Sequence, residues 1–434
     1  MRDLSFIGVA ILVVTAPLAA QTPLPPRVTL EEALSRAAAN SHRLGELRAR
    51  ESAAGAVLDQ RRAADLPIVS GQAGYQRTNH VDPFGFIVQD GKLQVLYPDV
   101  PDNWHARLDM QWPIYTGGRT KALEQAAAAE QQATGKDLES ARADLRLETT
   151  RAFWALVTAT ESVSVVGESV TRIEGQLNDV RARFDAGFLP PNDVLTVDAR
   201  VLQQRTLLIQ AINQRDGARS ELARLMGAPV DASFDVDAVL ADAGVSAPAG
   251  NLTLQRADRE ALKLRADAAD ARIEAAKADN KPSIAILGGY DYARPNPKIF
   301  PREDIGQDSW DLGVNVNFTL WNGGRTAAQV AEARHQAEAA RERLAEADTQ
   351  IALEIRQRQL DLASSRSQVE TAAAAVRSAT EARRVVAERF TAGVATSTDL
   401  LDAQVDQLEA ELNRTRALAN VKLAEARLAR ALGN

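Results

Sequence analysis

The sequence predicts a mainly α-helical fold with a small β part, internally duplicated and built on long coiled-coil helices. Three observations predict it. A strand-like segment, a glycine pair and a turn recur at one spacing in the two halves of the 434-residue chain. Apolar residues repeat in heptad steps along stretches too long for an ordinary globular helix. Aromatic residues make up only 5% of a chain rich in alanine, which is typical of closely packed helices.

The duplication follows from alignments without gaps. Trp104–Thr120 aligns with Trp310–Thr326 at a spacing of 206 residues, and the same spacing aligns the two turns described below. A further match, between residues 67–75 and 282–290, has a spacing of 215 residues. We therefore expect a signal peptide over residues 1–20, a first repeat over 21–226, a linker over 227–250 and a second repeat over 251–434. Each repeat would hold a helix, two strands and a long helical hairpin.

The N-terminus resembles a secretory signal peptide. Arg2 precedes an apolar run over residues 4–14, and small residues up to Ala20 suit cleavage before Gln21. The alternative is an uncleaved anchor helix, but the run is shorter than the roughly 20 residues that a spanning helix needs. No later segment is apolar enough for such a helix, so a chain that crosses a membrane would have to use strands.

Each repeat starts with a helix, over residues 30–65 and 254–279. A first strand follows at 68–77 and 283–292, and a second at 104–115 and 310–321. The second strands alternate between apolar and polar residues, with aromatic residues at both ends. This pattern is typical of a strand with one face in lipid and one on a watery lumen, the alternative being a soluble strand with one core face. The residues expected to face lipid are Trp104, Leu108, Trp112, Trp310, Val314 and Phe318.

A glycine pair follows each second strand, where the long helix begins. Gly117–Gly118 and Gly323–Gly324 suit a backbone with positive φ, or a close approach between strand and helix. A phosphate-binding loop is the alternative, but the glycine spacings of the nucleotide-binding motifs are missing.

From Thr120 to Phe184 the chain contains no proline, and at 1.5 Å per residue this stretch would span about 100 Å as one helix. Its apolar residues follow heptad intervals from Val163 to Phe184. The alternative, a lone amphipathic helix on a globular core, should have a period nearer 3.6 and end within about 20 residues. The second repeat echoes the heptad pattern before and after its own turn.

The long helices end in two matching turns. Gly187 and Gly393 suit C-terminal helix caps, and Asn192 and Thr398 suit the N-caps of the helices that follow. Capping also explains an aspartate in the first turn of each following helix, where the helix dipole favours an anion. Those aspartates are Asp193 and Asp399; capping does not explain Asp402, one turn later on the same face.

Together, the turn motifs, the strand–glycine junctions and the duplication resemble the TolC family of outer-membrane factors, over essentially the whole chain after its signal peptide. The resemblance implies a homotrimer in the cell outer membrane that extends into the periplasm. Each subunit would give four strands to one twelve-stranded transmembrane β-barrel, surrounded by outer-membrane lipid, and its helices would form an α-helical barrel. The implied partners are a periplasmic adaptor (membrane fusion protein) and an inner-membrane pump of the RND, ABC or a similar class.

Residue roles follow from the same resemblance. The segment from Thr398 onward is similar to one whose two aspartates ring the closed periplasmic aperture, which implies a gate at Asp399 and Asp402. Three-fold symmetry would then place six carboxylates around one opening and attract cations there.

The resemblance also implies that the tips contact the adaptor and lock the channel closed. Asp193 matches a lock aspartate, but the lock tyrosine is replaced by Phe390 and the lock arginine by Ala395. Any closure must therefore use other contacts near Gly187 and Gly393.

Nothing in the sequence indicates catalysis, so we expect no enzyme, no cofactor and no metal. The chain lacks cysteine, and its net charge of −7 comes from interspersed signs with no basic block for nucleic acid. The four histidines lack metal-ligand spacing: His42, His80, His105 and His335. The predicted function is a passive exit duct for efflux or type I secretion. The alternative is a periplasmic coiled-coil adaptor or structural protein without a membrane barrel.

Overall fold

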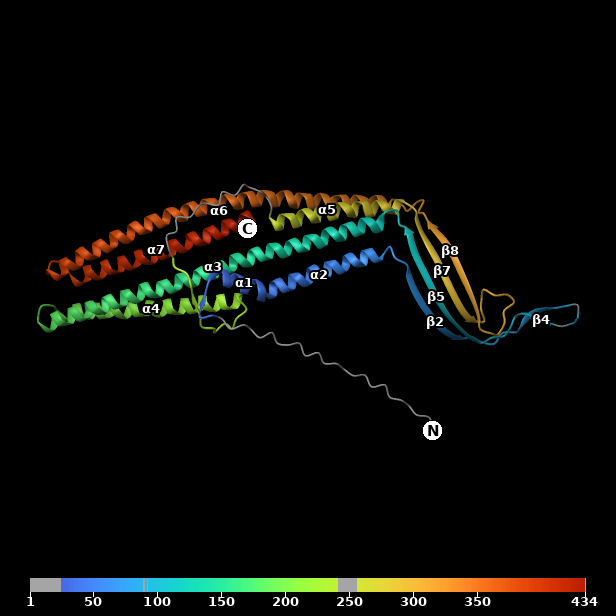
Figure 1. Ribbon diagram of the computed structural model, residues 1–434, viewed down its shortest axis with the longest axis horizontal. Coiled ribbons are helices and arrows are strands. Elements are labelled where there is room, and N and C mark those ends of the chain that lie inside the picture. Colours follow the sequence, from blue (N-terminus) through green and yellow to red (C-terminus); the bar gives the residue numbers. More distant parts are fainter. Residues whose placement is uncertain (1–24, 89, 92, 241–255, 434) are drawn as a thin grey trace, which may run out of the picture. The chain divides into compact units, whose positions relative to one another are not determined.

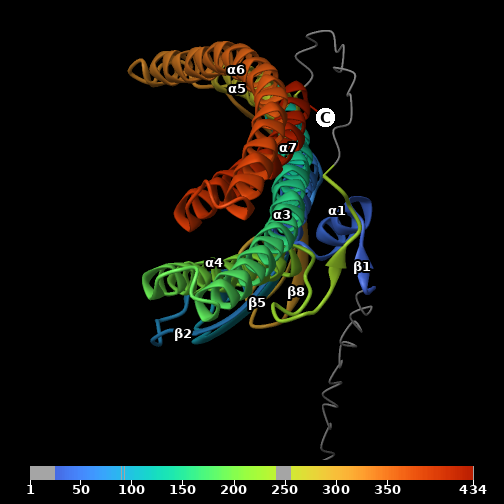
Figure 2. The same ribbon diagram turned by 90° about the vertical axis from the view of Figure 1, so that its left-hand side faces the viewer.

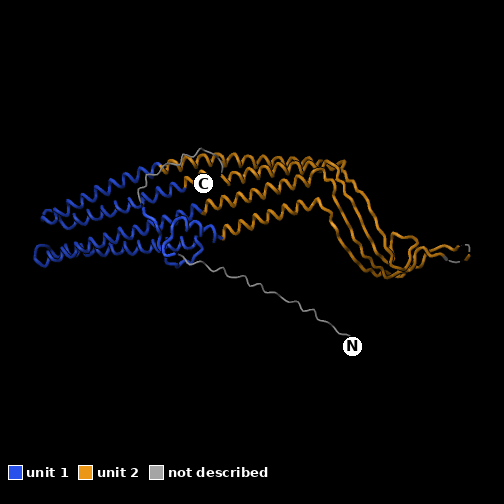
Figure 3. The backbone as a smooth tube through the Cα atoms, viewed as in Figure 1, with its two compact units in different colours: residues 1–41, 146–245, 363–426 blue, residues 42–145, 246–362, 427–434 orange. Residues whose placement is uncertain are grey.

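The computed structural model describes residues 25–88, 90, 91, 93–240 and 256–433, which fall into two units (Figure 3). Unit 1 comprises residues 1–41, 146–245 and 363–426, and unit 2 comprises residues 42–145, 246–362 and 427–434. The expected signal peptide, 1–20, and the end of the expected linker, 241–250, lie outside the described residues.

Unit 2 contains a four-stranded antiparallel sheet in the order β2–β5–β7–β8 (Figure 1). Its strands are β2 (Ile68–Arg77), β5 (Asp102–Tyr115), β7 (Ser283–Arg294) and β8 (Gln307–Asn317). All four predicted strands are confirmed, and β5 of the first repeat pairs with β7 of the second. Within the sheet, β2 and β8 each have one neighbour, so each leaves one edge unpaired.

One strand boundary corrects the prediction. β8 ends at Asn317, which pairs with Ser283, so Phe318 lies one residue beyond the strand in which it was expected. Phe318 would lie opposite Pro282, just before β7, and this proline has no N–H to continue the ladder.

The strand register separates an apolar face of the sheet from a polar one. Leu108 pairs with Tyr290, and Tyr290 pairs with Trp310, so these three lie in one row. Because side chains alternate along each strand, Arg107 and its partner Asp291 lie on the opposite face. The predicted alternation thus extends across the strands of the sheet.

The loop between β2 and β5 contains a small hairpin of its own. Its strands are β3 (Phe84–Ile87) and β4 (Leu93–Tyr97), which pair antiparallel. The β7–β8 loop, residues 295–306, lies between Arg294 and Gln307.

The predicted helix over residues 30–65 is two helices, α1 (Leu30–Asn40) and α2 (His42–Ala63), separated by Ser41 in an extended conformation. Asn40 explains the break. Its side-chain amide donates to the carbonyl of Met226 at 2.8 Å, and a Cβ on Gly227 would lie 2.5 Å from its Cβ. Asn and Ser are also unfavourable in the middle of a helix.

The other helices agree closely with the prediction. The two long ones are α3 (Arg119–Asp185) and α6 (Arg325–Thr391), followed by α4 (Pro191–Leu225) and α7 (Ser397–Leu432). In the second repeat, α5 (Ala257–Lys277) continues as the short 3₁₀ helix η1 (Ala278–Asn280). No helix among the described residues is both long and apolar enough to cross a membrane.

Unit 1 brings the two helical hairpins, α3–α4 and α6–α7, together. One apolar cluster draws on all four helices: Ile173, Leu177, Val180, Val197, Val201, Phe390, Leu400 and Leu401. The heptad positions of α3 are thus confirmed as a packed seam as far as Val180, whereas Phe184 at its end is 39% exposed. A short parallel pair, β1 (Arg27–Val28) with β6 (Asp235–Val236), completes unit 1 (Figure 2).

Candidate functional site

The two hairpin turns share one C-terminal cap. Gly187 has a φ of 80°, its N–H donates to the carbonyl of Phe184 at 2.8 Å, and the N–H of Phe188 donates to the carbonyl of Arg183 at 2.9 Å. The second turn repeats both bonds around Gly393, whose φ is 75°. This pair of bonds satisfies the last carbonyls of the helix and requires the left-handed conformation that glycine adopts without strain. The predicted capping role of both glycines is confirmed.

The predicted N-caps are wrong. Asn192 and Thr398 lie inside the first turns of α4 and α7, because both helices begin earlier, after Pro190 and Thr396. Thr396 forms a reciprocal cap with Asp399: the N–H of Asp399 donates to the threonine Oγ1 at 3.1 Å, and the N–H of Thr396 donates to the carboxylate at 2.9 Å. In the turn of the first hairpin, α3–α4, the N-cap residue is Pro190, which makes no side-chain hydrogen bond.

The cap fixes the charge of Asp399. Hydrogen bonds from the backbone and side chain of Thr396 hold the pKa of this carboxyl below its usual value, and Arg389 lowers the same pKa further. Because the pKa is lower in the folded state than in the unfolded state, ionised Asp399 stabilises the folded state at pH values above the ordinary pKa of aspartate. That contribution is lost as the pH falls through the lowered value. The cap therefore keeps Asp399 ionised to lower pH than an ordinary aspartate.

Asp402 has a different environment. It follows Asp399 by one turn of α7, its side chain is 64% exposed, and the guanidinium of Arg200 on α4 lies 3.6 Å from its carboxylate. Asp193 lies in the first turn of α4, as predicted. The structure thus places Asp399 and Asp402 on neighbouring turns of one helix and Asp193 on the other hairpin.

A contact between the two turns was not predicted from the sequence. Arg183, at the end of α3, donates from Nη1 to the carbonyl of Phe390 at 3.3 Å, and its guanidinium lies 4.7 Å from the centre of the Phe390 ring. A cation at the last carbonyls of a helix is favourable, and so is one over an aromatic ring. Phe390 stands where the resembled family has its lock tyrosine, and here its ring and its carbonyl both contact Arg183.

Magnitudes indicate what joins the hairpins. An exposed ion pair such as Arg200–Asp402 contributes at most about 1 kcal/mol, whereas each fully buried Val, Leu or Phe side chain contributes about 1.5–3 kcal/mol. The apolar cluster therefore supplies most of the attraction between the hairpins. The polar contacts at the turns set their alignment and can be exchanged at little cost.

The glycine junctions have the predicted backbone. Gly117, Gly118, Gly323 and Gly324 have φ values of 67°, 91°, 67° and 83°. Close approach occurs in one repeat only. A Cβ on Gly117 would lie 2.9 Å from both the carbonyl oxygen of Ala278 and the Cβ of Lys281, whereas a Cβ on Gly323 would meet nothing within 4 Å.

This difference gives a matched pair of variants. We expect Gly323→Ala to cost about 1–2 kcal/mol, the strain of a left-handed alanine. Gly117→Ala adds a backbone clash to the same strain and should lower the thermal unfolding midpoint of the detergent-extracted protein further. Equal midpoints for the two variants would contradict the close approach at Gly117.

The apolar face of the sheet is exposed over its whole width. Trp310 is 74% exposed, Val314 67% and Leu108 57%, and the same face continues onto β2 and β7. Trp112 is also exposed and donates from its indole nitrogen to the carbonyl of Asp65 at 3.1 Å, while Trp104 is partly covered by the ring of Tyr292. A contiguous exposed apolar surface of this kind marks a membrane or protein interaction site.

The family model of the outer membrane efflux proteins matches residues 33–228 and 250–434. The chain belongs to the outer membrane efflux protein family. This confirms the resemblance to the TolC family and makes the chain an outer-membrane protein of efflux or secretion systems. The alternative function considered from the sequence, that of a periplasmic adaptor, is not supported.

Members of the family and proteins of the same fold resemble the chain over most of its length. Outer membrane protein TolC of Vibrio cholerae serotype O1 is 23% identical over 93% of this chain and 90% of its own length. Alkaline protease secretion protein AprF of Pseudomonas aeruginosa is 21% identical over 70% of this chain and 64% of its own length. The Campylobacter jejuni CmeC outer membrane channel has a TM-score of 0.81 at 16% identity, covering all of this chain and 94% of CmeC, and so shares its fold.

Proposed function

We propose that three copies of this chain form the exit duct of a tripartite efflux or type I secretion system, a passive channel gated at its periplasmic tips. The observation that carries the proposal is the four-stranded sheet, with one apolar face and two unpaired edges. An isolated sheet of this kind leaves backbone groups and apolar side chains without partners in a membrane. Pairing β8 of one copy with β2 of the next removes every edge after three copies and closes a twelve-stranded barrel.

The alternation of the strands supports the orientation of this barrel. Exposed tryptophan, leucine and valine side chains on one face suit the lipid, and the charged row that contains Arg107 and Asp291 suits a watery lumen. Of the six residues expected to face lipid, all but Phe318 lie within the strands, on this apolar face.

For the gate, we propose the turn that begins α7. Asp399 is held ionised by its cap and Asp402 is exposed one turn later, so three copies would present six carboxylates at one constriction. The neighbouring contacts, Arg183 with Phe390 and Arg200 with Asp402, join the two hairpins and take the place of the family's lock. Because these contacts are individually weak, a bound partner could exchange them for its own.

For partners, we propose a periplasmic adaptor that engages the turns around Gly187 and Gly393, and an inner-membrane pump. The family and one relative support the two kinds of transport, efflux and secretion: the family is that of the outer membrane efflux proteins, and AprF is a protease secretion protein. We propose no catalytic role, because a passive duct requires none.

Reconstitution tests the proposal directly. The full chain, expressed from residue 1, should be recovered from the outer-membrane fraction with detergent, as a trimer. The purified trimer should give stepwise conductance in a planar lipid bilayer. A soluble periplasmic form, or a detergent-extracted trimer that never conducts, would contradict it.

A further inference from the structure

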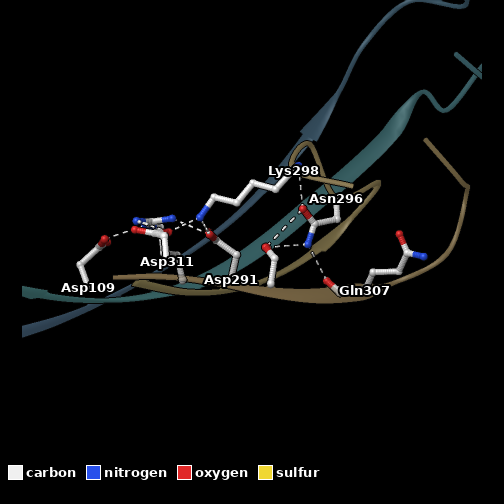
Figure 4. A network of polar contacts seen from close by, with 8 residues as sticks. Asp109, Asp291, Asn296, Lys298, Gln307 and Asp311 are labelled. Carbon is white, nitrogen blue, oxygen red and sulfur yellow. Dashed lines mark hydrogen bonds and ion pairs between the residues drawn. The ribbon is translucent and has the colours of Figure 1, made fainter. Parts of the chain in front are cut away.

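The β7–β8 loop, residues 295–306, is fastened at its start by a buried asparagine. Asn296 is 1% exposed, and its amide donates to the carbonyl of Gln307 and to Oγ of Ser309, both at 3.0 Å. Its side-chain oxygen accepts the N–H of Lys298 at 2.9 Å. The start of the loop therefore turns back toward the strands, with the Lys298 side chain directed at Asp291 and Asp311 (Figure 4).

The turn directs Lys298 onto the charged row of the polar face. Its ammonium donates to Asp291 at 2.6 Å and also to Asp311, as Figure 4 shows. Asp291 is only 14% exposed, because Arg107 donates to the same carboxylate oxygen at 2.5 Å. One loop residue is thus tied to two strands, β7 and β8.

The polar face leaves room for this network. Gly289 lies between Asp109 and Asp311 in the strand register. A Cβ on Gly289 would lie 2.4 Å from a guanidinium nitrogen of Arg107, so only glycine lets that guanidinium lie across β7. Arg107 donates at 2.6 Å to Asp109 and at 3.5 Å to Asp311. This network thus contains two cations, Arg107 and Lys298, and three carboxylates, so the network of each chain has one net negative charge.

The same loop also holds the neighbouring β3–β4 hairpin. The N–H of Arg302 donates to the carbonyl of Leu96 at 3.2 Å, its guanidinium lies 5.2 Å from the centre of the Tyr97 ring, and Phe300 packs edge-on against that ring at 6.2 Å. The position of the β7–β8 loop therefore also determines where β4 lies.

We infer that the β7–β8 loop is a fixed constriction at the outer mouth of the duct, with Lys298 as the residue that sets its width and its ion preference. The inference rests on the proposed function, because the polar face borders the lumen only in the closed barrel. Lys298 has two roles there: its bonds hold the loop over the lumen, and its charge offsets part of the carboxylate charge. A lumen constriction with less positive charge favours cations more strongly.

Two variants separate these roles. Lys298→Met removes both the tie and the charge, so single-channel conductance in a planar bilayer should rise and the reversal potential in a KCl gradient should shift toward that of potassium. Asn296→Ala loosens the loop without changing any charge, so conductance should rise with the reversal potential unchanged. Lys298→Arg keeps both roles and should restore wild-type values. Lys121→Met, which removes an exposed ammonium from the first turn of α3, is the matched control.

The outcomes distinguish the inference from the function beneath it. A wild-type trimer that conducts, with Lys298→Met and Asn296→Ala trimers of the same size that conduct identically to it, would overturn the constriction and leave the duct intact. A wild-type trimer that does not conduct would contradict the duct itself. If Lys298→Met fails to form trimers, Asn296→Ala still decides whether the loop narrows the mouth, and recovery of conducting trimers with Lys298→Arg shows that the loop needs a cation at this position.

Discussion

Replacing Val314 by arginine is expected to prevent the chain from assembling in the outer membrane. Val314 lies on the apolar face of β8, is 67% exposed and pairs with Ile286. An arginine on the lipid face costs about 2–4 kcal/mol near the bilayer midplane, and a trimer would incur this cost three times. The total is comparable with the whole stability of an ordinary domain, about 5–15 kcal/mol. The amount of trimer extracted from the outer-membrane fraction measures the effect.

The next residue along the strand provides the control. Asn315 lies on the polar face and is exposed, so Asn315→Arg adds the same side chain to the proposed lumen. That variant should assemble normally and change only the conductance. Loss of the Asn315→Arg trimer alone would show that the two faces have been assigned the wrong way round, and equal assembly of the two variants would contradict the placement of the Val314 face in lipid.

The second large effect is expected at the turn before α7. Asp399→Asn and Asp402→Asn, combined, should strongly weaken the block of single-channel current by divalent cations, because six charges leave the constriction of the trimer. Asparagine is preferable to alanine at position 399, since its side-chain oxygen can still accept the N–H of Thr396. Loss of a helix cap typically costs about 1 kcal/mol. An alanine at position 399 would therefore change both the charge of the gate and the stability of the turn, and the two effects could not be separated.

Asp193→Asn serves as the comparison for this experiment. It removes one charge from the corresponding turn of the first hairpin, where the helix is capped without a side chain. We expect it to leave the divalent block unchanged. A block that survives the double substitution, or that weakens equally with Asp193→Asn, would move the gate away from the second turn.

The sequence predicted those features whose cause is local. Strand alternation, the heptad seam and the positive φ of the glycine pairs each follow from residues within a short window. The duplication then doubled the evidence for each. The pairing of β5 with β7 and the order of the sheet needed the structure, because strand register depends on partners nearly 200 residues apart in the chain.

Side-chain contacts between the repeats could not be predicted in this way. Arg183 occupies the same position in its turn as Arg389, yet it is Arg183 that reaches across to Phe390. The misplaced N-caps have a similar origin. Pro190 and Thr396 are equivalent in the duplication, and α4 and α7 begin at equivalent positions, so the backbone was retained while the capping chemistry diverged. Alignment of the repeats identifies the turn but not which of its side chains is used.

The two unpaired edges of the sheet, β2 and β8, have a consequence for how the protein is made. If the chain forms the proposed trimer, a newly exported subunit that has not yet assembled presents two strand edges and a broad apolar surface to other subunits. Head-to-tail addition through such edges gives a ring only if the rotation closes, and an open chain of subunits otherwise. Productive assembly and aggregation therefore both begin with the pairing of strand edges from two subunits, and the rates of both rise with subunit concentration. Slow expression should raise the yield of trimer more effectively than any stabilising substitution in the helices.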